Sequence, residues 1–278
     1  MRGLALISLN GSSATGGSVL SSGYDPIVRA SRVSELVCRS EGGVESRLYY
    51  RFRADRWYGG IATGDVIGCN LSCVFCWSWR FKDNPALGKP YKPSEVVERI
   101  VAIARGRGFG RVRLSGGEPT ICRKHLIEVA GLLEGYDLEF IVETNGLLLG
   151  YDRGYARELS RFTNVVVRVS FKGVSPEEFH KLTGARPEFY ELQFKALENL
   201  IDAGLEPGVR VYPAAMIGFS SDDGVRAFVE RLSSIHPALA DVDWEYVIMY
   251  PHVRERLEKL KIKPLRAVDP RGVPLEMI

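Results

Sequence analysis

The sequence lacks any long hydrophobic run. None of its 278 residues belongs to an apolar stretch near the roughly 18–20 residues that a membrane-spanning helix requires, so we expect no membrane partner. The opening segment MRGLALISLNGSS has one arginine and a hydrophobic stretch too short for a secretory signal. We therefore expect a cytoplasmic protein.

Amide and thiol side chains are scarce. Glutamine occurs once and asparagine six times, a composition typical of a thermophile.

Five cysteines are too few for a disulfide-rich scaffold, and their number is odd. Three of them, Cys69, Cys73 and Cys76, lie within eight positions, which in a reducing compartment indicates metal or redox chemistry. We expect Cys38 and Cys122 to be isolated thiols, Cys122 being a small buried residue.

An excess of one charge is also lacking. The 37 basic and 34 acidic side chains leave a formal charge of +3, which is too small to indicate a nucleic-acid partner by itself. With 45% hydrophobic and 26% charged residues, the composition excludes a disordered or collagen-like chain. The length suits one large α/β domain or two small ones.

From residue 60 onward, short β-branched runs alternate with longer amphipathic segments. Strands are predicted over 61–67, 111–115, 138–143, 164–171, 208–216 and 244–249, and helices over 93–107, 123–134, 153–161, 187–204, 222–235 and about 252–261. This alternation implies parallel strands joined by right-handed crossovers. Too few residues follow Met249 for two further strand–helix units, so an eight-unit barrel does not fit.

The predicted fold class is therefore α/β, an open partial (β/α)6 barrel with an N-terminal extension. The barrel core covers residues 60–250, and a C-terminal helix and tail cover 251–278. The extension, residues 1–59, begins with a Gly/Ser-rich mobile arm over 1–23 and ends with a strand-like segment.

That strand-like segment, residues 47–58, interleaves four arginines with five aromatic residues. Two interpretations stay open. The segment is either an edge strand or hairpin that covers the barrel, or a surface that stacks on bases and contacts phosphates of an RNA.

Period-2 alternation divides four neighbouring strands into one apolar face and one face with polar or charged residues. The polar faces carry Arg111, Arg113, Glu143, Arg168, Ser170, Lys172, Arg210 and Tyr212. A packed core cannot hold unpaired charges. We therefore predict a wet cavity that holds a charged ligand, the alternative being that the charges pair with one another. Arg168, Arg210 and Tyr212 are candidate contacts of substrate or cofactor, again with structural ion pairing as the alternative.

The three clustered cysteines form a C-x3-C-x2-C loop, Cys69-Asn-Leu-Ser-Cys73-Val-Phe75-Cys76-Trp77, directly after the first predicted barrel strand. A closed zinc site needs four ligands, and no further cysteine pair or histidine lies nearby. Three thiolates with a vacant fourth position indicate an iron–sulfur cluster with one iron open to an exchangeable ligand. A structural zinc completed by Cys38 or Cys122 is the alternative.

Three further motifs follow at successive strand ends: Ser115-Gly116-Gly117-Glu118-Pro119, Glu143-Thr144-Asn145-Gly146 and Ser170-Phe171-Lys172. Together with the cysteine loop, they resemble the radical S-adenosylmethionine (radical SAM) superfamily, and most closely its pyruvate formate-lyase activating enzymes. Ser170 departs from that branch, which carries an acidic residue there. The resemblance covers residues 60–250.

The resemblance implies the cofactors and their ligands. Cys69, Cys73 and Cys76 would bind a 4Fe–4S cluster whose fourth iron binds S-adenosylmethionine (SAM). In the GGEP motif, which Pro119 completes, the methionyl amine of SAM would be bound by Gly116, Gly117 and Glu118. The carboxylate or ribose would be bound by Asn145, which follows Thr144, and by Ser170 and Lys172. The adenine would lie beside Phe75 and Trp77. His252 is weakly similar to the histidine of a Pro-Tyr-His turn in the activating enzymes.

The implied reaction is reductive cleavage of SAM to methionine and a 5′-deoxyadenosyl radical, which abstracts hydrogen from a substrate. The electron would come from a flavodoxin or ferredoxin, and the shared first step needs no catalytic acid or base from the chain. An activase-like enzyme with a protein substrate is the leading hypothesis. An RNA-modifying radical SAM enzyme that docks RNA on residues 47–58 is the alternative. A non-enzymatic iron–sulfur protein for electron transfer or structure is the second alternative.

Overall fold

Six parallel strands form the centre of the computed structural model, which describes residues 23–273. They pair in the order β3, β5, β6, β7, β8 and β9. Their bounds are Ile61–Val66, Arg111–Ser115, Glu139–Thr144, Val165–Phe171, Val211–Met216 and Asp243–Glu245. Over the residues described, no strand pairing joins β9 to the opposite edge of the sheet, so the barrel stays open on that side. This confirms the predicted α/β fold with an open partial barrel.

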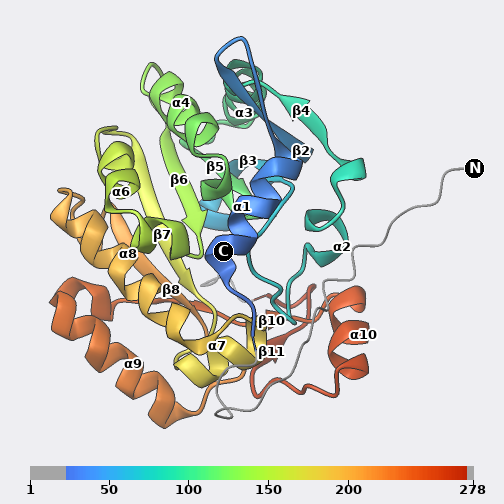
Figure 1. Cartoon of the computed structure of the whole chain (residues 1–278), viewed down its shortest axis with the longest axis vertical. Coiled ribbons are helices and arrows are strands. Elements are labelled where there is room, and N and C mark those ends of the chain that lie inside the picture. The colour runs from blue at the N-terminus through green and yellow to red at the C-terminus, as the bar shows by residue number, and fades with distance from the viewer. Residues whose placement is uncertain (1–22, 274–278) are drawn as a thin grey trace, which may run out of the picture.

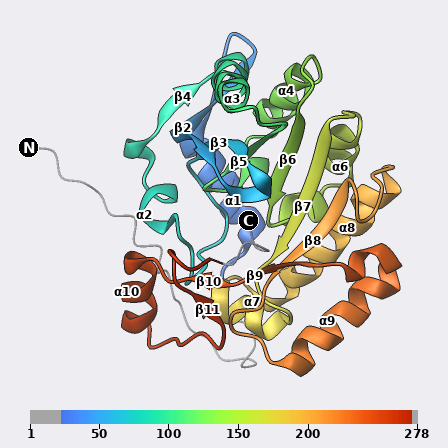
Figure 2. The same ribbon diagram turned by 180° about the vertical axis from the view of Figure 1, so that it is seen from behind.

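The helices lie mainly outside the curved sheet. Figures 1 and 2 show α4, α6 and α8 along its outer face, while the reverse view exposes the strands. The apolar strand faces predicted from alternation, including Val112, Val142 and Val167, are buried under these helices in one continuous core. The helices are α1 Pro26–Val37, α2 Trp79–Lys82, α3 Pro93–Arg107, α4 Arg123–Leu133, α5 Leu147–Tyr151, α6 Arg153–Ser160, α7 Pro176–Thr183, α8 Glu191–Asp202, α9 Asp222–Ile235 and α10 Pro251–Lys259.

Three antiparallel strands extend the sheet on the N-terminal side. β2 (Val44–Asp55) pairs with β3 and also with β1 (Cys38–Glu41) and β4 (Lys89–Tyr91). The segment 47–58 is therefore the edge strand and hairpin of the first interpretation. The predicted mobile arm, residues 1–23, lies outside the described residues apart from Gly23.

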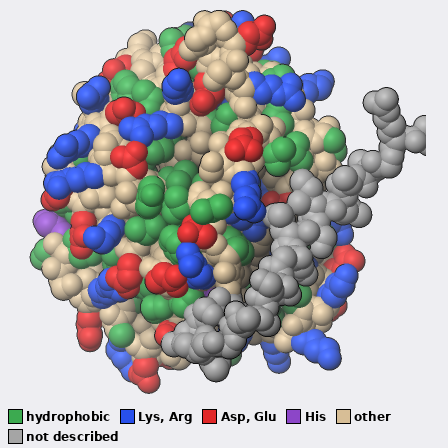
Figure 3. Space-filling view, in the orientation of Figure 1, with side chains coloured by type: hydrophobic (Ala, Val, Ile, Leu, Met, Phe, Trp, Pro, Cys, Tyr) green, Lys and Arg blue, Asp and Glu red, His purple; other side chains and the backbone are tan. Residues whose placement is uncertain are grey.

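The same pairing leaves only part of residues 47–58 available for RNA docking, which stays a prediction: Arg51 and Arg56 are exposed. Arg47 is fully buried, and Arg51 and Arg53 both donate to the buried carboxylate of Asp65. Tyr49 is also buried. On the face that Figure 3 shows, cationic and anionic side chains are interspersed, so this face offers no continuous basic strip.

Several elements differ from the sequence-based expectation. The sixth strand ends at Glu245, and β10 (Val247–Ile248) pairs instead with β11 (Ala267–Val268). Helix α7 was not predicted, although Ser175 caps its first turn, Pro176 opens it and Gly184 ends it in a left-handed conformation. Helices α1 and α5 were also not predicted. Among the residues described, no helix has the length and apolar character needed to cross a bilayer.

Cys38 and Cys122 form a disulfide, which corrects the expectation of two isolated thiols and excludes either as a zinc ligand beside the cysteine loop. The bond joins the start of β1 to the residue directly before α4. Cys122 is buried, as predicted, in a small cluster with Val37, Leu48 and Ile67. The pairing was not visible in the sequence because 84 residues separate the two cysteines.

Removal of this disulfide, by Cys38→Ser with Cys122→Ser, should lower the free energy of unfolding by about 2–4 kcal/mol, because the bond restricts the unfolded chain. Urea unfolding of both proteins measures the difference. Alkylation of the denatured, unreduced wild type should label the three remaining thiols and no more. Labelling of all five cysteines under oxidising conditions would contradict the pairing.

Candidate active site

The cysteine loop, residues 67–78, leaves the carboxyl end of β3 through a sharp turn. Gly68 takes a positive φ of 94°, and a Cβ there would lie 2.8 Å from Val33, so the turn requires glycine. Cys69, Cys73 and Cys76 are free thiols that line one cavity of about 960 Å³. Burial raises the pKa of Cys69 to about 11 and that of Cys73 to about 12. Metal binding to these thiols must therefore release their protons.

The GGEP turn, residues 116–119, follows β5 and packs directly on the cysteine loop. A Cβ on Gly117 would lie 2.3 Å from the carbonyl oxygen of Gly68, so only glycine fits this contact. The backbone N–H of Glu118 donates to that same carbonyl at 2.8 Å. On the other side, the Ser78 hydroxyl donates to the carbonyl of Gly116. The two loops therefore form one unit at the carboxyl edge of the sheet.

The carboxylate of Glu118 is occupied within the protein. Oε1 accepts from the backbone N–H of Thr120 at 3.1 Å and from the hydroxyls of Thr120 and Thr144 at 2.7 Å each. Oε2 accepts from the backbone N–H of Asn145 at 2.8 Å. Oε1 thus accepts three hydrogen bonds and Oε2 one, which leaves Oε2 with one acceptor position. Glu118 also lines the cavity, and its contact with the methionyl amine stays a prediction.

Asn145, at the end of β6, is held on several sides. Its amide group donates to Oδ1 of Asn70 at 2.7 Å and its Oδ1 accepts from the backbone N–H of Leu147. Its backbone carbonyl accepts from Nε2 of Gln193, which also donates to the carbonyl of Ser170. The single glutamine of the chain thus links the ends of β6 and β7. Sequence reasoning missed Gln193 and Asn70 as parts of the site.

One side of the barrel interior holds a chain of ion pairs around Arg113. The guanidinium donates to Glu143 at 2.7 Å, to Asp55 at 2.6 Å and to the Thr63 hydroxyl at 3.0 Å. Tyr58 also donates to Glu143, at 2.6 Å. Burial alone would raise the pKa of Glu143, but Arg113, Arg168 and the Tyr58 hydrogen bond together lower it below its usual range.

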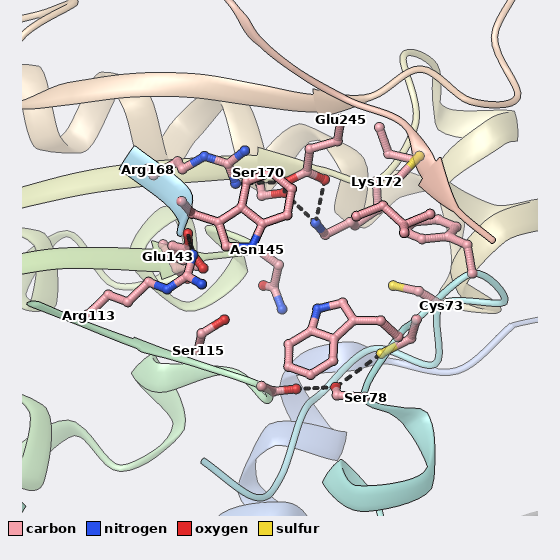
Figure 4. Close-up of a pocket in the computed structure, with 18 of the residues that line it drawn as sticks. Cys73, Ser78, Arg113, Ser115, Glu143, Asn145, Arg168, Ser170, Lys172 and Glu245 are labelled. Carbon is pink, nitrogen blue, oxygen red and sulfur yellow. Dashed lines mark hydrogen bonds and ion pairs between the residues drawn. The ribbon is translucent and has the colours of Figure 1, made fainter. Parts of the chain in front are cut away.

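The other side holds a second group, centred on Glu245 of β9. This carboxylate pairs with Arg168 at 2.7 Å and Lys172 at 3.3 Å and accepts from the Ser170 hydroxyl at 2.7 Å. Arg168 also pairs with Asp243 at 2.7 Å. Burial would raise the pKa of Glu245, yet the charges of Lys172 and Arg168 lower it to about 2. Both groups face the same space as Cys73 (Figure 4).

The cavity and the paired charges therefore coexist, so the two interpretations of the polar strand faces were not exclusive. The alternation rule found Arg113, Arg168 and Lys172, but it missed their partners Asp55 and Glu245. Continued into residues 243–245, the same rule would have found Glu245. Lys82, a buried lysine that also lines the cavity, follows no motif in the sequence.

Most of the predicted site residues line this one cavity. The cavity-lining members are Cys69, Cys73, Phe75, Cys76, Trp77, Gly116, Gly117, Glu118, Thr144, Asn145, Arg168, Ser170, Lys172, Tyr212 and His252. Pro119 lies behind the turn, where its carbonyl accepts from Arg47. The prediction that Arg210 contacts substrate or cofactor is corrected. Arg210 precedes β8, and its guanidinium donates to the carbonyls of Phe162 and Val165. It is a structural residue outside the cavity.

His252 and Trp77 meet at the edge of the cavity. Nε2 of His252 lies 2.6 Å from the carbonyl oxygen of Trp77, and the imidazole stacks on Tyr250. The Trp77 ring also has the guanidinium groups of Arg51 and Arg53 within 6 Å of its centroid. These contacts fix the end of the cysteine loop against α10 and β2.

The donor set fits an iron–sulfur cluster bound to SAM. Three free thiols come from one loop, and the remaining two cysteines of the chain are joined to each other. The cavity is large enough for a second polar molecule beside the thiols. Glycine backbone, amide and lysine groups border it at the strand ends. Such a set suits a cluster with one open iron and an amino acid moiety.

The fold and this donor set define an open (β/α) barrel with a three-cysteine metal site at the carboxyl ends of its strands. A family model described as the radical SAM superfamily matches residues 66–232, which is more than half of the chain. The protein therefore belongs to the radical SAM superfamily, and its cofactors are a 4Fe–4S cluster and SAM.

Among curated proteins, the chain is similar to probable GTP 3′,8-cyclases. It is 32% identical to one from Saccharolobus islandicus over 230 residues, which cover 76% of this chain and 70% of the relative. It is 30% identical to another from Methanothermobacter thermautotrophicus, over 50% of this chain and 43% of that relative. The chain spans about half the length of this relative and of those from Thermoplasma volcanium and Methanosarcina acetivorans.

Solved structures show the same fold. SuiB from Streptococcus suis, bound to S-adenosylmethionine, superposes with a TM-score of 0.50 at 19% identity, over 72% of this chain and 43% of that one. HydG, a maturase of the [FeFe]-hydrogenase, gives a TM-score of 0.52 at 13% identity, over 65% and 41% of the two chains. At these identities, the likeness concerns the fold alone.

Replacement of Cys73 by alanine should abolish iron binding after anaerobic reconstitution, because one of three thiolates is lost. Formation of 5′-deoxyadenosine from SAM with dithionite should then be undetectable. Iron content and chromatography of the nucleoside measure both. The matched control removes other cysteines: Cys38→Ser with Cys122→Ser should bind iron as the wild type does. Equal iron loss in that control would refute the assignment of ligands.

The low pKa of Glu245 predicts an acid-sensitive component of stability. A carboxylate with a pKa of about 2 in the folded state and about 4.3 in the unfolded chain stabilises the fold above the higher value. That contribution is lost as pH falls through this window. Glu245→Gln should lose about 3 kcal/mol at pH 7 and show a shallower decline between pH 4.3 and 2.

Urea unfolding of the metal-free proteins across this pH range tests the prediction. Glu255→Gln is the control, because Glu255 forms an exposed pair with Arg80 and should change stability little. Parallel pH curves for wild type and Glu245→Gln would show that Glu245 does not titrate as proposed.

Proposed function

We propose that the protein uses SAM-derived radical chemistry on a small anionic substrate of the nucleotide class, with GTP as the first candidate. The observation that carries this is the charged cavity in which the three thiols, the GGEP turn and the ion-paired strand ends meet. The similarity to proteins named GTP 3′,8-cyclase supports the choice of nucleotide.

The size of the cavity supports a small substrate. A volume of about 960 Å³ lies near the upper end of the roughly 300–1,000 Å³ that ligand pockets span. There is room for SAM and for a second molecule of similar size beside it. A folded protein segment would have to enter through the open side of the barrel, between β2 and β9, where paired charges line the walls.

The side of the cavity away from the cysteines offers groups that suit a nucleotide. Arg56 lines the cavity, is exposed, and has no carboxylate partner in residues 23–273. Trp57 and Trp244 line the same cavity and are half-buried. An unpaired guanidinium suits a phosphate, and indole rings suit the flat face of a base.

The other hypotheses have less support. The relatives carry the cyclase name, not that of an activating enzyme, so an activase-like role on a protein substrate is not favoured. Of the four arginines in residues 47–58, Arg47 is buried and Arg51 and Arg53 are paired with Asp65, which gives RNA docking there little support. An electron carrier would need neither the GGEP turn nor the polar strand ends, whereas the cavity brings both together. The electron donor is proposed to be a flavodoxin or ferredoxin.

Anaerobic turnover tests the proposal. The reconstituted protein, dithionite and SAM should release 5′-deoxyadenosine slowly alone, and at least tenfold faster with GTP. Mass spectrometry should detect a GTP-derived product with a new bond. ATP, CTP and UTP are the comparison substrates. Equal rates with and without every nucleotide would exclude this substrate class while leaving the SAM chemistry intact.

Arg56→Gln separates substrate binding from SAM cleavage in the same assay. The KM for GTP should rise about tenfold, while the slow substrate-free rate should not change. Arg157→Gln is the matched control, because Arg157 is exposed on α6 and does not line the cavity. An unchanged KM in Arg56→Gln would remove Arg56 from the substrate site.

A further inference from the structure

Arg47 of β2 is a buried cation without a carboxylate partner among the described residues. Its side chain is fully buried. The guanidinium donates to the backbone carbonyls of Pro119 at 2.5 Å, Glu118 at 2.6 Å and Ile67 at 3.3 Å. Figure 1 places β2 at the N-terminal side of the barrel, outside the run of parallel strands. β2 thus reaches the carboxyl edge of the sheet through this side chain.

Burial of such a charge is costly. An ionised group that leaves water without an ionised partner needs several well-placed hydrogen bonds, and a hydrophobic residue of similar volume would often stabilise the fold better. The guanidinium of an arginine presents five donors in a fixed plane and so reaches acceptors that lie apart, whereas a lysine presents three donors on a single nitrogen. The residue therefore calls for an explanation beyond the packing of β2.

The three carbonyls belong to the two loops that form the site. Ile67 lies two residues before Cys69, and Glu118 and Pro119 belong to the GGEP turn. Other ties between these loops are the hydrogen bond from Glu118 to Gly68, that from Ser78 to Gly116 and the close contact of Gly117. All three run between the two loops themselves. The Arg47 guanidinium joins both loops by hydrogen bonds to a third element of the sheet.

We propose that Arg47 is a positioning residue for SAM binding: it fixes the GGEP turn at the distance from the cysteine loop at which a cluster-bound SAM molecule can contact both. Loss of the guanidinium would leave the cysteines in place and let the GGEP turn shift. The proposal rests on the family's cofactors and is independent of GTP as substrate, so the two can fail separately.

The experiment compares Arg47→Met, Arg47→Lys and the wild type after anaerobic reconstitution. Each protein should contain the same iron per chain. The Kd for SAM, from equilibrium dialysis with labelled SAM, should rise at least tenfold in Arg47→Met and by an intermediate factor in Arg47→Lys. The paramagnetic resonance spectrum of the reduced cluster should change on addition of SAM in the wild type, and less at the same SAM concentration in Arg47→Met.

Arg99→Met is the matched control. Arg99 is exposed on α3 and packs its guanidinium over Phe52 of β2 and Tyr91 of β4, without contacting either loop. Its loss should leave the Kd for SAM unchanged. An equal increase in Arg99→Met, or wild-type SAM affinity in both Arg47 variants, would overturn the proposal. So would SAM binding that falls only in proportion to lost iron. If Arg47→Met does not fold, Arg47→Lys alone decides: wild-type affinity there refutes the role.

Discussion

The carboxylate of Glu118 is the contact on which the arrangement of the site depends. Its four donors come from Thr120, directly after the GGEP turn, and from the end of β6, while the backbone N–H of the same residue reaches the cysteine loop. One buried residue therefore joins segments that leave three neighbouring strands. Without these donors the buried carboxylate would be strongly destabilising. The linked strand ends therefore form a single rigid part of the cofactor site.

The same constraint acts in the barrel interior. Arg113, Arg168 and Lys172 each have an acidic partner on another strand. These pairs keep the lumen polar while neutralising the charges of the three cations, and they leave space that an apolar barrel core would fill. A polar lumen of this kind suits radical chemistry on a polar substrate, because the charged side chains that line it already pair with one another. Groups without partners, such as Arg56, are then free for the ligand.

Much of the site was readable in the sequence because its residues follow local rules. Cysteine spacing identified the cluster ligands, and the glycines at 116 and 117 marked a close approach of two backbones. Period-2 alternation identified Arg168 and Lys172. The sequence did not predict contacts between residues far apart in the chain: the partner of Arg168, the disulfide between Cys38 and Cys122, and the role of Arg47. Arg210 was misplaced because β8 begins at Val211, three residues later than the predicted start at residue 208.

By itself, the sequence determined the fold class, the three-thiol centre and the family chemistry, since each depends on the order and spacing of neighbouring residues. The tertiary structure alone decided which charges neutralise one another and which stay available. It also showed that Glu118 links three strand ends within the cavity wall and that Arg47 supports two of them from outside the cavity, although the sequence places Arg47 in a basic segment. The reason is physical: the hydrogen bonds and ion pairs of a side chain depend on donors and acceptors up to 175 positions away along the chain, and only folding brings them together.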